Sequence, residues 1–312
     1  MRILVTGGAG FIGSTVVDAY VANGFEVVVL DNLSTGDRRN LNPEARFVEG
    51  DLRDAKAVAQ AMEGVDVVNH HAAQMDVRRS VADPVFDAET NIVGSLQLVQ
   101  AALERGVKKV IFASSGGAAY GEPTTYPQTE EHPTWPLSPY GVAKLSFEHY
   151  LFYVREVHGL PYVALRYANV YGPRQRKDGE AGVVAIFGGK LLAGETPVIN
   201  GDGLQTRDYV FVEDVVRANV AALRDDLHGA FNIGTGIETS VVDLFEILRS
   251  VCGSSMRAEH APAKKGEQLR SVLDGTKLRN LAGLPEPVPL RKGLERTIAW
   301  MRESVAAPQS RP

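Results

Sequence analysis

Tyr140 and Lys144 carry the clearest chemistry in this sequence. They lie four residues apart at the start of a segment with helical periodicity, and of the ten tyrosines only Tyr140 has a lysine at that spacing. Residues four apart share one face of a helix. A free phenol has a pKa near 10 and a neighbouring ammonium favours the phenolate, so the pair could take a proton from a hydroxyl group. The alternative interpretation is an ordinary solvated helix face.

Ser114 and Ser115 follow an apolar segment that predicts a strand over 109–113. Ligands of open α/β sheets bind at the carboxyl ends of the strands. A serine hydroxyl at that edge could hydrogen-bond the same substrate oxygen from which the phenol takes a proton. The end of the strand predicted over 109–113 and the start of the helical segment at Tyr140 are therefore expected to form one catalytic site.

A glycine-rich loop joins the first predicted strand to the first predicted helix, where residues 6–13 read TGGAGFIG. Gly7 permits the tight turn, Gly10 lets the backbone approach a pyrophosphate, and Gly13 lets the helix pack against the strand. The helix N-terminus adds free N–H groups and the positive end of its dipole. In this context the loop predicts a dinucleotide site and not an ordinary glycine-rich turn.

Asp31, at the end of the second predicted strand, indicates which dinucleotide binds. An acid at this position accepts hydrogen bonds from the adenosine ribose and repels a 2′-phosphate, so it favours NAD over NADP. Arg38 and Arg39 are close in sequence and keep NADP as the alternative. Asp51, after the third predicted strand, either borders the adenine or caps a helix.

The elements that must position these groups alternate between strands and helices. Continuous apolar runs predict buried strands, and spacing of three to four residues predicts helices. Strands are expected over 2–6, 26–30, 46–48, 66–69, 109–113 and 162–166, and helices over 12–21, 55–62, 85–105 and 138–158. Ser138 is expected to cap the last helix, with Pro139 at its first position. This order predicts an α/β fold with a doubly wound, parallel Rossmann-type sheet.

After Arg166 the segments become shorter and richer in Gly and Pro, with helical patterns over 212–223, 241–251 and 290–302. We expect a dinucleotide-binding Rossmann domain over 1–167 and about 208–233. A smaller, partly interleaved substrate lobe is expected over 168–207 and 234–304, followed by a flexible tail over 305–312. Residues 122–136 contain four prolines, and a loop of that length is often functional.

Composition and charge exclude several classes of protein. The 312 residues carry 33 basic and 38 acidic side chains, a net charge of −5, without a basic stripe, which disfavours a nucleic-acid or anionic membrane surface. No apolar run approaches the ~20 residues of a membrane helix. The single cysteine, Cys252, and an N-terminus without a signal-peptide pattern indicate the cytoplasm. No metal site is expected, because no metal-ligand spacing accompanies the seven histidines.

Together these motifs resemble the extended short-chain dehydrogenase/reductase family over nearly the whole chain. The segments that carry the resemblance are TGGAGFIG at 6–13, HHAAQ at 70–74, ASSGGAAYGE at 113–122, SPYGVAK at 138–144, LRYANVYGPRQ at 165–175 and GDGLQTRDYVFVED at 201–214. They are most similar to those of bacterial UDP-glucose 4-epimerases. The resemblance implies an NAD-dependent isomerase of galactose metabolism. Such an enzyme inverts C4 of a UDP-hexose through a transient 4-keto sugar and forms a homodimer through the helices at 85–105 and 138–158.

The resemblance also implies roles for individual residues. Ser115, Tyr140 and Lys144 form the catalytic triad, with Ser114 as the alternative hydroxyl because the segment that follows is one residue longer than usual. The residues expected to hold NAD are Gly7, Gly10, Phe11, Ile12, Gly13, Asp31, Asn32, Ser34, Gly36, Asp51, Leu52, Ala72, Ala73, Gln74, Asn91, Tyr140, Lys144 and Tyr167. Those expected to hold the UDP-sugar are Ser115, Tyr140, Asn169, Val183, Asn200, Arg207, Lys264 and Glu267.

Three positions depart from the family pattern. Lys264 replaces a usual phosphate-binding arginine, Asn200 replaces a usual aromatic beside the uracil, and Ser271 replaces the bulky aromatic of several hexose-restricted members. The small Ser271 predicts a roomier sugar pocket that admits N-acetylated sugars. Arg207 is expected on the diphosphate, which its fork geometry suits. The alternative for Arg207 is a salt bridge with Asp208 or Glu213.

Related activities share the first oxidation step. A 4,6-dehydratase needs an acid pair after the catalytic hydroxyl and a decarboxylase usually has a glutamate there, whereas this chain has Gly116 and Gly117. A UDP-glucuronate 4-epimerase would use the same chemistry and stays open. A non-catalytic NAD(H)-sensing protein is disfavoured because Tyr140 and Lys144 are both present.

Overall fold

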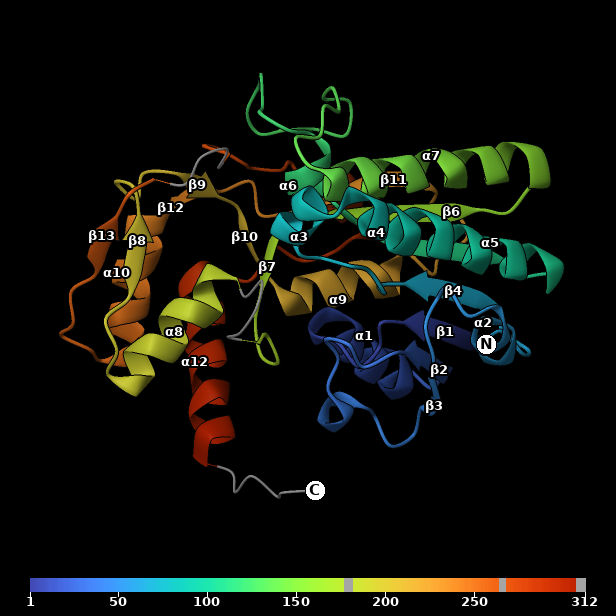
Figure 1. Cartoon of the computed structure of the whole chain (residues 1–312), viewed down its shortest axis with the longest axis horizontal. Coiled ribbons are helices and arrows are strands. Elements are labelled where there is room, and N and C mark those ends of the chain that lie inside the picture. Colours follow the sequence, from blue (N-terminus) through green and yellow to red (C-terminus); the bar gives the residue numbers. More distant parts are fainter. Residues whose placement is uncertain (177–181, 264–267, 307–312) are drawn as a thin grey trace.

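A seven-stranded parallel sheet forms the centre of the computed structural model, which describes residues 1–176, 182–263 and 268–306. The strand order is β11-β6-β5-β4-β1-β2-β3 (Figure 1). The strands are β1 (Arg2–Thr6), β2 (Glu26–Asp31), β3 (Arg46–Glu49), β4 (Val67–His70), β5 (Lys109–Ser115), β6 (Tyr162–Tyr167) and β11 (Gly229–Ile233). The order reverses between β1 and β4, where open sheets bind ligands. The predicted doubly wound sheet is confirmed, and β11 extends it.

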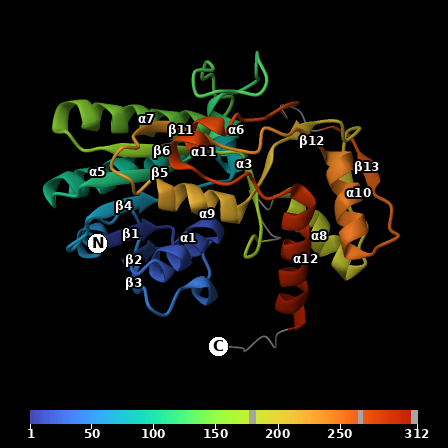
Figure 2. The same ribbon diagram turned by 180° about the vertical axis from the view of Figure 1, so that it is seen from behind.

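Helices cover both faces of this sheet, as Figures 1 and 2 show from opposite sides. One face carries α1 (Phe11–Ala22), α9 (Val212–Ala221) and α11 (Thr276–Ala282), and the other carries α2 (Ala55–Ala61), α5 (Gly94–Glu104) and α7 (Pro139–His158). Because side chains alternate across a strand, Ile3 and Val5 of β1 join the first core and Leu4 joins the second. The continuous apolar strands therefore reflect burial on both faces.

The segment at 85–105 differs from the single helix that its periodicity predicts. It contains α4 (Pro84–Ala88), a π-helical segment η2 (Glu89–Val93) and α5, and it is preceded by α3 (Val77–Ala82). A π-helical turn inserts one extra residue, and such turns are frequent at functional sites. Asn91, an expected cofactor residue, lies in the middle of η2.

The long helix α7 begins where the sequence predicts. The Ser138 side chain accepts a hydrogen bond from the Gly141 N–H at 3.1 Å, and Pro139 occupies the first helical position. Gly159 ends the helix with a φ of 72°, in the left-handed region that favours glycine. The cap thus fixes the turn that carries Tyr140.

A second lobe packs α8 (Val183–Ala193), α10 (Val241–Cys252) and α12 (Leu290–Ala306) around a separate core, at the left of Figure 1. Its short strands form three pairs: β7 (Asn169–Tyr171) with β10 (Tyr209–Phe211), β8 (Val198–Asn200) with β13 (Glu259–Ala261), and β9 (Thr206–Arg207) with β12 (Thr239–Ser240). The helix α12 continues to Ala306, past the expected start of the tail at residue 305, and residues 307–312 lie outside the described part. Within the described ranges no helix is long and apolar enough to cross a membrane.

Candidate active site

The glycine-rich loop after β1 forms a cradle that side chains would fill. Gly7 has a φ of +70°, and a Cβ on it would lie 2.7 Å from the Ala72 nitrogen. A Cβ on Gly13 would lie 2.2 Å from the Gly7 carbonyl oxygen. The first turn of α1, which starts at Phe11 and Ile12, carries no acidic side chain. Free amide groups and the helix dipole at this end therefore suit a diphosphate.

Asp31 connects this loop to the segment after β2. Its Oδ2 accepts a hydrogen bond from the Ala9 N–H at 3.0 Å and its Oδ1 accepts one from the Leu33 N–H at 2.8 Å. Burial raises the pKa of this carboxyl group. A carboxylate has about four acceptor sites, so two such bonds leave sites for a ribose hydroxyl group. Arg38 and Arg39, the residues that could bind the 2′-phosphate of NADP, are paired with the acids Glu49 and Asp37. Because their charges are already compensated, the arrangement favours NAD over NADP.

Further residues expected to hold NAD lie together after β2 and β3. The Asn32 side chain donates a hydrogen bond to Asp51 at 2.8 Å and accepts one from the Ser34 N–H at 3.0 Å. Hydrogen bonds from Arg53 hold the pKa of Asp51 well below its usual range. The helix-cap interpretation of Asp51 is wrong, because Asp54 caps α2. Of the remaining expected residues here, Gly36 lies against the Asp31 carboxylate and Leu52 is buried in the core.

A second group of expected cofactor residues follows β4. The Ala72 N–H donates to the Thr6 hydroxyl at 3.1 Å, and Ala73 comes next. The Gln74 N–H donates to the Asn91 Oδ1 at 2.8 Å, and the Asn91 Nδ2 donates back to the Gln74 carbonyl oxygen at 2.8 Å. The carboxylate of Asp87, which the sequence analysis did not single out, accepts hydrogen bonds from both amide side chains. Its only signal in the sequence is the spacing of four residues from Asn91.

Lys144 reaches from α7 to the end of β5. Its ammonium donates a hydrogen bond to the Ala113 carbonyl oxygen at 2.8 Å and lies 5.7 Å from the centre of the Tyr140 ring. The residue is 4% exposed, and burial lowers the pKa of Lys144 to about 8. Burial and the negative charge of Asp87 raise the pKa of Tyr140. Phenolate formation therefore requires a further positive charge nearby, which an oxidised nicotinamide ring would supply.

Gly141 brings the first turn of α7 against α6 (Gly116–Ala119). A Cβ on Gly141 would lie 2.4 Å from the Ala118 carbonyl oxygen. Ser115 caps α6, since its hydroxyl accepts a hydrogen bond from the Ala118 N–H at 3.4 Å. The close contact of the two helices therefore brings the turn that carries Tyr140 against the short helix that Ser115 caps.

Replacing Gly141 with alanine is expected to destabilise the protein by about 1–3 kcal/mol, because the new methyl group must displace the backbone of α6 or α7. Urea unfolding measures the change. Gly117→Ala is the matched control, since a Cβ at Gly117 meets its nearest atom, the Ser271 hydroxyl oxygen, at an ordinary 3.6 Å. Equal unfolding free energies for the two variants would contradict the prediction.

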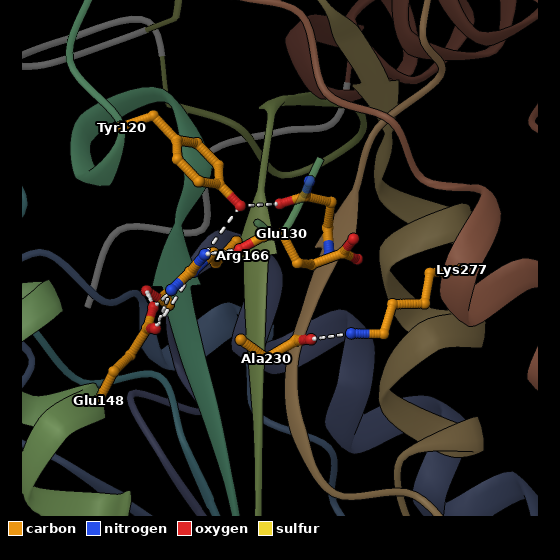
Figure 3. Close-up of polar contacts among 8 residues, drawn as sticks. Tyr120, Glu130, Glu148, Arg166, Ala230 and Lys277 are labelled. Atoms are coloured by element: carbon orange, nitrogen blue, oxygen red, sulfur yellow. Dashed lines mark hydrogen bonds and ion pairs between the residues drawn. The ribbon is translucent and has the colours of Figure 1, made fainter. Parts of the chain in front are cut away.

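Ser114 and Ser115 point in different directions, as neighbouring residues of a strand do. The Ser114 hydroxyl is buried and donates to the Glu148 carboxylate at 2.5 Å. Glu148 is in turn paired with Arg166, which also binds the Tyr120 hydroxyl (Figure 3). Ser115 is half-buried at the start of α6. The geometry thus favours Ser115 as the hydroxyl of the site.

Apart from Ser115 and Tyr140, the described substrate candidates lie on the second lobe: Asn169 begins β7, Val183 begins α8, Asn200 ends β8 and Arg207 lies in β9. The two acids proposed as alternative partners of Arg207 are engaged elsewhere. Asp208 accepts backbone hydrogen bonds from Thr235, Gly236 and Leu273, and Glu213 pairs with Arg217 and Arg296. Lys264 and Glu267 lie outside the described residues.

Tyr167 ends β6, and its phenol is buried in the core on the α1 side, where it accepts a hydrogen bond from Asn219 at 2.8 Å. In the described ranges no group of three or more metal-ligating side chains occurs.

Comparison with known proteins decides the family. Residues 3–234 match the NAD dependent epimerase/dehydratase family. The chain belongs to this family. The UDP-glucose 4-epimerase of Mycolicibacterium smegmatis is 46% identical over 309 residues, covering 97% of this chain and 99% of the relative.

The fold of this family member is very similar to that of two solved structures. The UDP-glucose 4-epimerase of Thermotoga maritima, crystallised with UDP-glucose, is 48% identical with a TM-score of 0.95, covering 98% of this chain and 100% of the other. The Thermus thermophilus UDP-glucose 4-epimerase in complex with NAD is 43% identical with a TM-score of 0.92, covering 97% and 99%. For this epimerase/dehydratase family member, the cradle after β1 and the acid Asp31 fit NAD.

Proposed function

We propose that the chain is a UDP-glucose 4-epimerase of galactose metabolism, which uses NAD to interconvert UDP-glucose and UDP-galactose. One observation carries the proposal. The first turn of α7, with half-buried Tyr140 and buried Lys144, meets the Ser115 end of β5, at the edge of the sheet that also holds the nucleotide cradle. The similarity to UDP-glucose 4-epimerases over nearly the whole chain supports this assignment.

The mechanism assigns one task to each residue of the triad. Tyr140 takes the proton from the sugar 4-hydroxyl and returns it when C4 has been inverted. Ser115 hydrogen-bonds the same oxygen, and Lys144, held by the Ala113 carbonyl, stabilises the phenolate. NAD held by the cradle after β1 and by Asp31 would supply the hydride acceptor and donor for C4 of the sugar. With Gly116 and Gly117 beside the site, the chain lacks the side chains that an elimination would require.

The two parts of the chain divide the ligands between them. We assign NAD to the part formed by 1–167 and about 208–233, and the nucleotide sugar to 168–207 and 234–304. Arg207 is proposed to hold the diphosphate, with Asn169 at the sugar and Val183 and Asn200 at the uracil. The buried carboxylate of Asp208 supports Arg207 by anchoring its strand to Leu273 and Thr235.

We also propose that the sugar pocket accepts N-acetylated sugars. Ser271 is 2% exposed and lies opposite Gly117 of α6. A Cβ on Gly117 would meet the Ser271 hydroxyl oxygen at 3.6 Å, an ordinary contact distance. The proposal of a roomier sugar pocket therefore rests on the small side chain of Ser271, where several members of the family carry a bulky aromatic.

Proton NMR of the purified protein without added NAD tests the activity. Incubation with UDP-galactose is expected to produce UDP-glucose, and incubation with UDP-N-acetylglucosamine to produce its C4 epimer. UDP-glucuronate is the third substrate, because it tests the alternative epimerase. Conversion of UDP-glucuronate alone, or of no sugar even after NAD is added, would overturn the assignment.

Ser115→Ala is expected to lower kcat by about 10²-fold, the effect of losing one well-placed hydrogen-bond donor in an active site. Ser114→Ala is the matched control, because its hydroxyl is turned toward Glu148. It is expected to change stability more than kcat. Initial rates with UDP-galactose measure both, and a greater loss of activity in Ser114→Ala would assign the catalytic hydroxyl to Ser114.

A homodimer is the assembly that we propose. Tyr150, Tyr153 and Val157 form an exposed apolar stripe on α7, which packs beside α4, η2 and α5 (Figure 1). Such a stripe on paired helices suits a second copy of the same surface. Light scattering is expected to give a dimer for the natural protein and a monomer for Tyr153→Glu; a monomer for the natural protein would overturn the proposal.

We also propose a cytoplasmic location, since the single cysteine is consistent with a reducing compartment.

A further inference from the structure

Asp87 is a buried carboxylate beside the active site that the mechanism above does not use. It lies on α4, is 1% exposed, and lines a groove with Ser138, Pro139 and Ala143 of the cap and first turns of α7. A charged group at this depth requires partners that compensate its loss of water. Its surroundings therefore indicate what it does.

Neutral amides hold Asp87. Its Oδ1 accepts hydrogen bonds from the Gln74 Nε2 at 2.9 Å and from the Asn91 Nδ2 at 3.0 Å. The Asn91 side-chain amide also accepts a hydrogen bond from the Gln74 backbone N–H and donates one to the Gln74 carbonyl oxygen, and the π-helical η2 carries Asn91. Asp87 thus fixes two side chains that are expected to hold the cofactor.

The negative charge of Asp87 acts on the catalytic pair. Asp87 raises the pKa of both Tyr140 and Lys144, and Glu148 acts on Lys144 in the same direction. At the end of β4, His70 and the following His71 face Lys144, and burial together with the Lys144 ammonium lowers the pKa of both imidazoles. Neither histidine therefore adds a second positive charge at neutral pH.

The two acids differ in how far their charge is compensated. Glu148 is paired with Arg166 at 2.7 Å, so its charge is largely neutralised. The side chains that donate hydrogen bonds to Asp87 are the uncharged amides of Gln74 and Asn91. In the described part of the chain, Asp87 is therefore the acid that balances the charge of Lys144.

We propose that Asp87 is a positioning residue of the active site, whose carboxylate fixes Gln74 and Asn91 and supplies the counter-charge that keeps Lys144 protonated beside Tyr140. This inference rests on the proposed function of that pair. If Asp87 has this role, its buried charge sets the pH range in which the enzyme is active.

Asp87→Asn separates the two roles, because asparagine keeps an oxygen that accepts both hydrogen bonds but loses the charge. The pKa values of Lys144 and Tyr140 should both fall, so both limbs of the kcat/KM profile are expected to move to lower pH by about one unit. At a pH above the alkaline limb, kcat/KM of the variant, relative to its own optimum, is therefore expected to be about tenfold lower than that of the natural holoenzyme. The KM for UDP-galactose and the amount of retained NAD should stay unchanged.

The controls use the same segment. Glu89→Gln removes an exposed negative charge two residues away and is expected to leave the profile in place. Asp87→Ala removes the acceptor oxygens as well and is expected to release NAD. If Asp87→Asn does not fold, Asp87→Glu carries the test, since it keeps the charge and is expected to keep both limbs while it retains less NAD.

Unchanged limbs in a folded, active Asp87→Asn protein, or moved limbs in Asp87→Glu, would overturn the inference. Failure of the proposed function looks different: Tyr140→Phe would then keep full activity, whatever the profile of the Asp87 variants. The two sets of variants, measured as holoenzymes over the same pH range, therefore distinguish the two failures.

Discussion

Tyr140→Phe is expected to lower kcat about 10³-fold, within the range that a positioned general base contributes. The substitution removes one oxygen atom and leaves the ring in place beside Lys144 and the α6 contact. Without the phenolate, the sugar 4-hydroxyl keeps its proton and C4 cannot be oxidised. The fold and the retained NAD should be unchanged.

Rates with UDP-galactose and the absorbance of reduced cofactor measure this effect. Tyr150→Phe is the matched control, because it makes the same change on the exposed side of the same helix. It should not affect kcat. A Tyr140→Phe protein that keeps more than about a tenth of the activity would assign the base to another group, since loss of a true base costs at least about 10²-fold.

Arg166→Met is expected to destabilise the protein by about 3–5 kcal/mol, because it leaves a buried carboxylate without its partner. The side chains of Arg166 and Glu148 are 8% and 7% exposed, and two guanidinium nitrogens bind the carboxylate (Figure 3). Arg166 also donates to the Tyr120 hydroxyl at 2.8 Å, which donates to Asn232 at 2.7 Å. One ion pair thus connects α7, β6, the end of α6 and β11.

The double variant Arg166→Met/Glu148→Leu tests the cause of this loss. Removing both charges leaves no unpaired ion, so most of the lost stability is expected to return. Arg249→Met breaks an exposed pair with Glu246 and should have a far smaller effect. Urea unfolding measures all three variants, and a double variant as unstable as the single one would point to lost packing and not to charge.

Features that depend on local patterns of residues could be predicted from the amino-acid sequence. Apolar runs predicted the strands from β1 to β6, and Ser138 with Pro139 predicted the start of α7 within one residue. The glycine spacing predicted the cradle, because a tight turn and a close helix exclude a Cβ whatever surrounds them. Tyr140 and Lys144 were recognisable together because helical spacing alone puts them on one face.

The tertiary structure alone decided which polar groups meet. Ser114 and Ser115 are neighbours in sequence, and only the packing of α7 against β5 shows that Ser114 is the one that faces Glu148. The π-helical η2 interrupts a periodicity that reads as one continuous helix.

Asp87 is the clearest example of a group that the sequence did not reveal. It precedes Lys144 by more than fifty residues, and yet its negative charge raises the pKa of Lys144. Burial and electrostatic fields depend on segments that come together only when the chain folds. For that reason the residues that could react were evident from the sequence, whereas those that set their charge and orientation were not.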